Sequence, residues 1–328
     1  MRCSVVILNW NGEQILHKFL PSVIAFSALE DCEVVVADNC STDNSIAILK
    51  QYPSVRLIQL DKNYGFAEGY NRAIQQIDSQ YIVLLNSDVE VTESWLKTML
   101  DFADNNPEVV AVQPKILSYG NRTYFEHAGA CGGFLDYFGY PYCRGRVLNK
   151  VEEDKGQYDT VCDVFWTSGA CMLVRRDVYL QVGGLDALFF AHMEEIDLCW
   201  RLNARGYRLV CLPQSVVYHL GGGTLNYDSP NKLYLNFRND LLMLYKNLPA
   251  PRLHFVLFIR FFLDYLVFFQ NLLQGKFQHA WAVVRARKDF LKLRLQKGEN
   301  SYSAQRKHNL QMAKIKFPTQ MKGLMFLQ

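Results

Sequence analysis

The stretch Y-I-V-L-L-N-S-D, residues 81–88, decides the fold of this chain. Five apolar residues run without interruption into Asn86-Ser87-Asp88, and such a run is typical of a strand buried on both faces of a parallel sheet. An unpaired carboxylate is costly inside such a strand. Asp88 is therefore expected where the strand leaves the sheet, at the carboxyl edge where open α/β sheets bind ligands. An isolated Asp at a strand end is more often a turn residue or a helix cap, so the rest of the chain must decide.

Strand and helix patterns alternate around this stretch. Strands are expected at residues 3–8, 33–37 and 55–60, and helices at 13–26, 44–51, 67–77 and 93–103. This alternation predicts βαβ units and a parallel sheet. Three strands end in polar residues, at Asn9, Asp38 and Asn86–Asp88, and right-handed crossovers bring such ends to one edge. We therefore expect a polar ligand at that edge.

The known phosphate-binding loops are missing from the sequence. No G-x-G-x-x-G follows the first strand and no G-x-x-x-x-G-K-[ST] occurs, which disfavours a dinucleotide site and excludes a P-loop. Acidic strand ends repel a bare phosphate. They suit a phosphate held through a divalent cation, because hard cations prefer carboxylate oxygens.

The second half of the chain departs from this rhythm. A strand at 109–117 is followed by residues 119–159, a loop-rich insertion with many Gly, Tyr and Phe residues. Its aromatic rings suit either sugar binding or a satellite core. A strand at 171–174, a short helix at 178–183 and two short strands at 208–212 and 215–218 complete this half. His219 follows the last strand, where it is either structural or part of a metal site.

Three acids, Glu194, Glu195 and Asp197, open a helix that runs to Ala204. Acids in a first turn interact favourably with the helix dipole, and this explanation needs no function. A carboxylate at the rim of a substrate cleft would instead accept a proton from a hydroxyl group.

Charge and hydropathy separate the tail from the body. Residues 1–250 carry 21 Lys and Arg against 29 Asp and Glu, whereas residues 251–328 carry 14 against 3. Residues 254–273 are long and apolar enough to span a bilayer. Arg260 and Asp264 lie four apart within them, where they can pair, and each is costly at a bilayer centre. A helix in the membrane interface, or docked on the body, therefore fits better.

The tail and the cysteines also bear on partners and location. The basic residues after position 276 favour an anionic membrane surface, with a solvated helix packed on its own domain as the alternative. Nucleic acid is disfavoured because the rest of the chain is acidic. The nine Cys form no C-x-x-C pair and fit a reducing compartment. The apolar run at 5–8 is too short for a signal peptide, so we expect a cytoplasmic protein, peripheral on the inner face of the cytoplasmic membrane.

Eight motifs in order resemble those of the family 2 glycosyltransferases, and most closely the bacterial members that build surface polysaccharides, including rhamnosyltransferases. They are S-V-V-I-L-N-W-N-G, V-V-A-D-N-C-S-T-D, N-Y-G-F-A-E-G-Y-N, L-L-N-S-D, S-G-A-C-M-L-V-R-R, G-G-L-D, F-F-A-H-M-E-E-I-D-L-C-W-R and V-V-Y-H-L-G-G-G, within residues 3–245. The resemblance implies an inverting enzyme of the α/β GT-A fold, with a mostly parallel central sheet flanked by helices. Residues 1–118 would form the nucleotide-sugar half and 119–250 the acceptor half of one domain, and 251–328 a helical extension.

The resemblance also implies roles for matching positions. Residues lining the nucleotide would be Leu8, Asn9, Asp38, Asn39, Gly65, Asn71, Asn86 and Ser87, with Asp38 accepting hydrogen bonds from the base. Asp88 and His219 would bind the Mg²⁺ or Mn²⁺ that bridges the diphosphate. Glu195 would be the general base, with Glu194 as its rival. Trp166, Gly169 and Ala170 would lie near the acceptor.

Two positions depart from the family pattern. Asn86 is neutral where the first Asp of D-x-D stands, and Glu195 occupies a position where Asp is common. The sequence nevertheless predicts a metal-dependent hexosyl- or deoxyhexosyltransferase that moves a sugar from a nucleoside diphosphate to a hydroxyl of a glycan or lipid-linked glycan. One alternative is a sugar nucleotidyltransferase, although residues 9–13 supply one Gly and no Lys or Arg for its triphosphate loop. The other is a glycan-binding scaffold that has lost catalysis, which only Asn86 supports.

Overall fold

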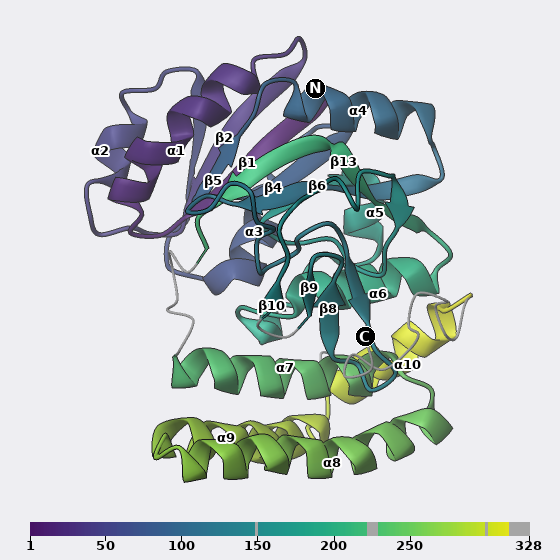
Figure 1. Ribbon diagram of the computed structural model, residues 1–328. Coiled ribbons are helices and arrows are strands. Elements are labelled where there is room, and N and C mark those ends of the chain that lie inside the picture. The colour runs from purple at the N-terminus through teal and green to yellow at the C-terminus, as the bar shows by residue number, and fades with distance from the viewer. Residues whose placement is uncertain (148–149, 222–228, 299–300, 315–328) are drawn as a thin grey trace.

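The structure, a computed structural model, describes residues 1–147, 150–221, 229–298 and 301–314. A nine-stranded mixed sheet forms its centre, in the order β11-β13-β6-β12-β4-β1-β2-β3, with β5 paired to β13 (Figure 1). The strands are β1 (Cys3–Asn9), β2 (Cys32–Asp38), β3 (Val55–Gln59), β4 (Tyr81–Asn86), β5 (Val89–Val91), β6 (Val109–Ser118), β11 (Cys162–Asp163), β12 (Cys171–Arg175) and β13 (Arg208–His219). The sheet confirms the predicted α/β class.

The register of the sheet brings the predicted polar strand ends together. Strands β3, β2, β1 and β4 run parallel, because each returns through a helix. Asn9 lies opposite Asp38, and Leu8 lies opposite Asn86. Residues 81–85 of β4 are fully buried, as their continuous apolar run requires. Strand β12 then joins β4 in the antiparallel sense and makes the sheet mixed.

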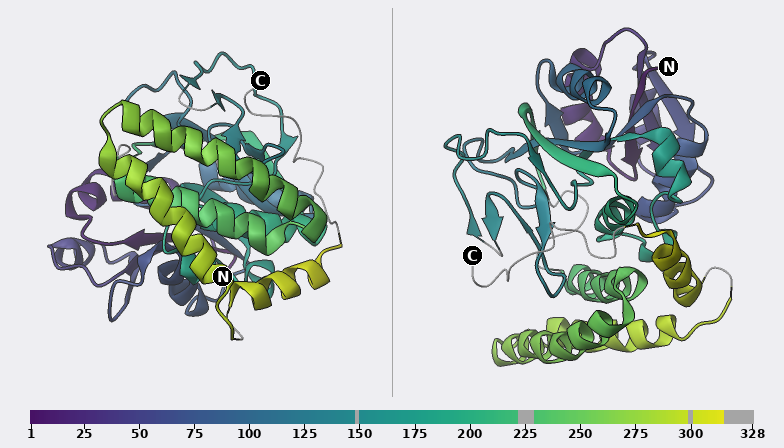
Figure 2. Two further views of the ribbon diagram at one scale, coloured as in Figure 1. Left: turned by 90° about the horizontal axis from the view of Figure 1, so that it is seen from below. Right: turned by 90° about the vertical axis from the view of Figure 1, so that its right-hand side faces the viewer.

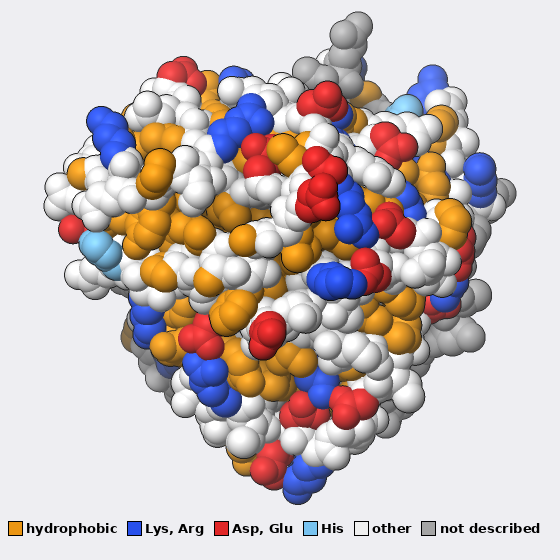
Figure 3. Space-filling model, turned by 90° about the horizontal axis from the view of Figure 1, so that it is seen from above, with side chains coloured by type: hydrophobic (Ala, Val, Ile, Leu, Met, Phe, Trp, Pro, Cys, Tyr) orange, Lys and Arg blue, Asp and Glu red, His pale blue; other side chains and the backbone are white. Residues whose placement is uncertain are grey.

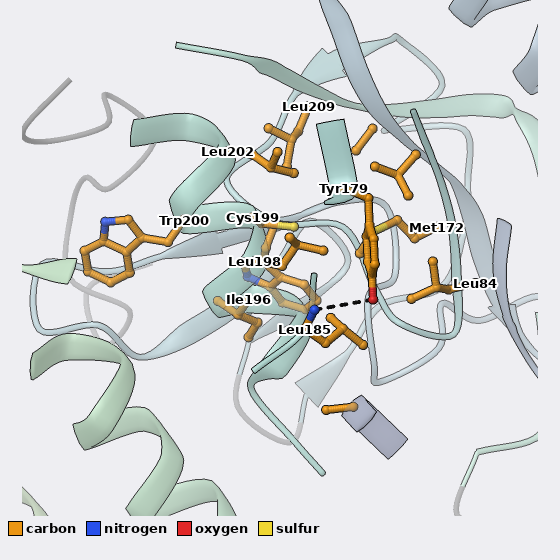
Figure 4. Close-up of a cluster of buried hydrophobic side chains, with 14 of the residues drawn as sticks. Leu84, Met172, Tyr179, Leu185, Ile196, Leu198, Cys199, Trp200, Leu202 and Leu209 are labelled. Carbon is orange, nitrogen blue, oxygen red and sulfur yellow. Dashed lines mark hydrogen bonds between the residues drawn. The ribbon is translucent and has the colours of Figure 1, made fainter. Parts of the chain in front are cut away.

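Helices cover both faces of the sheet (Figure 1). Helices α1 (Glu13–Phe26), α2 (Ser45–Leu49) and α4 (Trp95–Asn105) cover one face, and α3 (Gly65–Gln75), α5 (Arg176–Gln181) and α6 (Glu194–Ala204) the other. The second face holds the larger core, where Trp200 and Tyr179 are fully buried and the Tyr179 hydroxyl accepts a hydrogen bond from the Leu185 amide (Figure 4). This packing fixes α6, the helix that carries Glu194 and Glu195.

Some boundaries differ from the sequence expectations. The insertion at 119–159 contains an antiparallel sheet of β7 (Gly133–Leu135), β8 (Pro141–Cys143), β9 (Arg146–Val147) and β10 (Lys150–Val151), rather than loops alone. Two of its aromatic rings, Phe134 and Tyr142, stack on each other across this sheet. The two short strands expected at 208–218 are one strand, β13, which continues through a register shift between Leu212 and Val216. Turn residues within this segment made one strand look like two.

The C-terminal helices form layers beneath the body (Figures 1 and 2). They are α7 (Pro230–Asn247), α8 (Ala250–Leu273), α9 (Phe277–Arg294) and α10 (Tyr302–Met312). In α8 the Arg260 Nε lies 3.2 Å from Asp264 Oδ1, so the predicted ion pair is confirmed. Arg260 also pairs with Asp240 of α7, and Asp264 with Arg287 of α9. The division of the chain near residue 250 stays a prediction.

Candidate functional site

The first part of the site lies at the ends of β1 and β2. The Asn9 side-chain amide donates a hydrogen bond to Asp38 Oδ1 at 2.9 Å, and the Ser41 amide donates to Asp38 Oδ2 at 2.9 Å. Both side chains are buried, and within the described residues Asn9 Oδ1 has no hydrogen-bond partner. An ionised carboxylate retains lone pairs beyond these two bonds. Asp38 is therefore held in a fixed orientation and can still accept from a ligand.

The side chain of Asn39 binds the turn that follows β3 and holds it at this edge of the sheet. Its side chain donates to the Gly65 carbonyl at 3.1 Å and accepts from the Tyr64 amide at 2.9 Å. Gly65 has a φ of +76°, and a Cβ there would lie 2.6 Å from the Phe190 ring, so the position requires glycine. Leu8 lies against Gly69 of α3, where an added Cβ would be 2.9 Å from its methyl groups. The two glycines thus allow Phe190 and Leu8 to pack closely against this turn and α3.

The second part lies at the end of β4. Asp88 Oδ1 is 3.1 Å from Nε2 of His219, and Nδ1 of the same ring is 3.3 Å from Glu126 Oε2. All three side chains are buried. The side-chain nitrogen Nδ2 of Asn86 lies 3.4 Å from His219 Nε2, and Ser87, between Asn86 and Asp88 in the chain, is half-buried. The strand ends of β4 and β13 therefore meet, as the sequence predicted for Asp88 and His219.

The charges of Asp88 and Glu126 affect the protonation of His219, which lies between them. Burial disfavours a charge on His219, but the hydrogen bonds and charges of Asp88 and Glu126 outweigh it and raise the imidazole pKa to about 10. The donor set of one carboxylate and one imidazole suits Mn²⁺ or Mg²⁺ once the ring gives up its proton. No cluster of three or more His, Cys, Asp or Glu suited to a metal occurs within the described residues. Asp88 and His219 are donors of a kind that a divalent cation accepts, and their binding of one stays a prediction.

The third part is the pair of glutamates at the start of α6. The side chains of Glu194 and Glu195 each place Oε2 in a buried position without a hydrogen-bond partner among the described residues. Burial raises the pKa of Glu195 to about 7. Burial, together with the charge of Glu195, raises the pKa of Glu194 well above its usual range. Unpaired buried carboxylates are costly, and such sites are commonly functional.

The segment Gly169-Ala170 joins the second and third parts. The Asn86 amide donates to the Ala170 carbonyl at 3.0 Å. On the preceding residue, a Cβ added to Gly169 would stand 3.8 Å from Glu195 Cβ. Glu195 and the Asn86–Asp88 edge are thus separated by one short stretch of backbone. They belong to one region of the molecule, as the sequence interpretation required.

Two residues predicted for the site, Asn71 and Trp166, make packing and loop contacts instead. Asn71 accepts hydrogen bonds from the Tyr179 hydroxyl at 2.7 Å and the Leu185 amide at 3.0 Å, so it fixes the loop before α6. It lines a cavity of about 580 Å³ beside α10 that neither Asp88 nor Glu195 lines. Trp166 is buried over Gly133 and donates to the Phe134 carbonyl at 2.9 Å, which is a packing position. The structure therefore does not bring these two residues to the strand edge.

Two other residues were not anticipated. Glu126, from the insertion, holds the far side of the His219 ring. Asn239 of α7 is fully buried and donates to the carbonyls of Phe189, Ala191 and His192, the segment leading into Glu194 and Glu195. Phe190, His192 and Met193 in this segment have positive φ values, so the segment needs such support. Asn239 stands between Arg238 and Asp240, so no signal in the sequence singled it out, and its partners lie far away in the chain.

Comparison with known proteins identifies the family and confirms the fold. The profile of the glycosyl transferase family 2 matches residues 4–183. The chain is 27% identical over 256 residues to the N-acetylglucosaminyl-diphospho-decaprenol L-rhamnosyltransferase of Mycobacterium tuberculosis, covering 73% of this chain and 83% of that protein. It is 29% identical over 222 residues to the O-antigen biosynthesis protein RfbC of Myxococcus xanthus, covering 66% of this chain but only 17% of that much longer protein. The mannosyltransferase PcManGT of Pyrobaculum calidifontis, solved with GDP-Man and Mn²⁺, shares the fold at a TM-score of 0.56 and 13% identity, over 88% of this chain and 87% of that one.

Proposed function

Because the chain belongs to glycosyl transferase family 2, we propose that it transfers a sugar from a nucleoside diphosphate donor to a hydroxyl of a lipid-linked glycan, with inversion at the anomeric carbon. The relative from M. tuberculosis is named for transfer of L-rhamnose to a decaprenyl diphosphate-linked sugar. That name supports a deoxyhexosyl donor and a lipid-linked acceptor in surface polysaccharide synthesis. A lipid-linked acceptor would place this reaction at a membrane, and we propose the inner face of the cytoplasmic membrane.

Glu195 is the proposed general base. Its Cβ stands 3.8 Å from where a Cβ on Gly169 would be, and Ala170, the next residue, is hydrogen-bonded to Asn86; this juxtaposition carries the proposal. With a pKa of about 7, Glu195 can accept the proton of an acceptor hydroxyl near neutral pH. Burial, together with the charge of Glu195, also raises the pKa of Glu194. Of the two rivals, Glu195 is the one whose Cβ stands next to Gly169, so it is the proposed base.

The remaining residues would position the donor. Asp38 would hold the base of the nucleotide, while Asn39 and Gly65 keep the turn above it in place. Leu8, Asn9, Asn86 and Ser87 would line the nucleotide, and Gly169 and Ala170 the acceptor side. Asp88 and His219 would hold a divalent cation, which supplies positive charge to stabilise the leaving diphosphate. Asn71 and Trp166 would act through the loops they hold.

The experiment is a screen of nucleoside diphosphate sugars, deoxyhexosyl donors included, with a lipid-linked acceptor and Mn²⁺. Release of nucleoside diphosphate together with a glycosylated acceptor is the expected result. Tight donor binding without any release would contradict the proposal and favour the non-catalytic alternative. The nucleotidyltransferase alternative makes inorganic diphosphate only from a nucleoside triphosphate and a sugar 1-phosphate, so a parallel assay with those two substrates separates it from the proposal.

A further inference from the structure

Helix α8 has its polar and apolar faces reversed relative to a helix on a soluble protein. Its charged residues Arg260 and Asp264 are 1% and 0% exposed, whereas Phe258, Phe262 and Leu266 are 62%, 53% and 64% exposed. Surface helices normally turn their apolar stripe inward. Here, residues 255, 258, 262, 266, 269 and 273 repeat every three or four positions, so their apolar side chains form one continuous outward stripe.

Helix α9 continues this face with a different composition. Phe277, Trp281 and Leu295 are exposed, and Lys288 and Lys292 are exposed on the same helical side by their spacing. Viewed from below, α8 and α9 lie side by side over α7 (Figure 2). The opposite surface of the molecule mixes acidic and basic side chains with apolar areas (Figure 3). The lower face therefore combines aromatic rings, aliphatic side chains and ammonium groups.

We propose that this face, formed by the outer sides of α8 and α9, docks on an anionic lipid membrane, with α8 lying in the plane of the interface. Aromatic and aliphatic side chains enter the boundary between headgroups and acyl chains, while lysines bind anionic headgroups. The inference concerns a binding surface and does not depend on the sugar-transfer reaction.

The ion pairs of α8 explain why it lies on a membrane rather than through one. Helix α8 is the one helix in the described ranges long and apolar enough to span a bilayer. Arg260 bonds to Asp240 of α7, and Asp264 to Arg287 of α9, so the helix is attached along its side to the body. Spanning would break these pairs and place two charges in hydrocarbon.

Charge also argues against a second copy of the chain as the occupant. A two-fold dimer would place the same patch of each subunit against the other. Lys288 and Lys292 are exposed on the outer side of α9, so such an interface would bring like charges together. An anionic surface is complementary to this patch.

The test is co-sedimentation of the full chain with vesicles of phosphatidylcholine alone or mixed with phosphatidylglycerol. Binding to the mixed vesicles is expected. The double variant Phe258→Ser, Phe262→Ser should lose about tenfold or more in partition coefficient, because two apolar side chains no longer enter the interface. The double variant Lys288→Gln, Lys292→Gln should lose about fivefold per charge at low salt. Phe26→Ser, at the exposed end of α1, is the matched control and should bind like the parent.

Three outcomes would overturn the proposal. The first is parent protein that stays in the supernatant with mixed vesicles. The second is equal binding by the parent and both double variants. The third is a parent dimer in light scattering that Phe258→Ser, Phe262→Ser converts to a monomer, without vesicle binding by either protein. Release of bound protein by alkaline carbonate supports the in-plane arrangement, and retention after that treatment contradicts it.

Discussion

Replacing Glu195 by Gln tests the proposed base most directly. The substitution keeps the size of the side chain and removes its basicity. Loss of a general base typically lowers kcat by about 10²–10⁴-fold. Oε2 of Glu195 is buried and has no hydrogen-bond partner among the described residues. The adjacent acid, Glu194, is the rival base, and Glu194→Gln tests it separately. Donor binding should be unchanged, since Glu195 contacts neither Asp38 nor Asp88 in the described hydrogen bonds.

The pH profile gives a second measure of the same residue. With a pKa of about 7, roughly one tenth of Glu195 is ionised at pH 6 and about nine tenths at pH 8. For the parent, kcat/KM should therefore fall about tenfold per unit as pH drops below 7 and level off above it. Glu195→Gln should lack this inflection, and Glu194→Gln should keep it. A Glu195→Gln enzyme with the parent rate, or with the same inflection, would refute the assignment.

Three further predictions follow from other contacts. Asp88→Ala should abolish the Mn²⁺-dependent part of donor binding in calorimetric titration, and an unchanged titration would remove Asp88 from the cation site. Arg260→Met leaves two buried Asp side chains short of a partner and should lower the free energy of unfolding in urea by about 3–5 kcal/mol, whereas a cost below 1 kcal/mol would contradict the role of this pair. Asn239→Ala removes the donor to three carbonyls and should cost about 1–3 kcal/mol of stability and lower kcat more than it changes donor KM; an unchanged kcat would show that the loop needs no such support.

The local sequence pattern was sufficient to predict the shared sheet edge where the polar ends of β1, β2 and β4 lie. The apolar run at 81–85 and the polar residues after β1, β2 and β4 predicted strands, parallel order and a shared edge, and the register of Asn9 with Asp38 confirms it. The family resemblance, rather than the local pattern, placed Asp88 and His219 in one site, and their atoms lie 3.1 Å apart. Alternating strands and helices depend on periodicity within short windows, which a sequence shows directly.

Contacts that depend on tertiary packing could not be predicted from the local sequence pattern. Strands of two or three residues in the insertion give no usable period, so their sheet was expected as loop. Asn71 belongs to a motif that resembles a nucleotide turn, but its hydrogen bonds go to Tyr179 and Leu185 because α3 packs against the loop before α6. Glu126 reaches His219 only because β6 and β13 run side by side. Such pairings arise from the assembled fold and leave no local trace.

The position of β13 has a consequence for how the molecule matures. His219 meets Asp88 because this strand pairs with both β5 and β6, at Val89 and Ser118. Those partners are synthesised about a hundred residues earlier, so the two side chains come together in a late, long-range closure of the sheet. A cation that binds them would stabilise the closed form by mass action. Refolding followed with and without Mn²⁺ would then report when the final strand has entered its place.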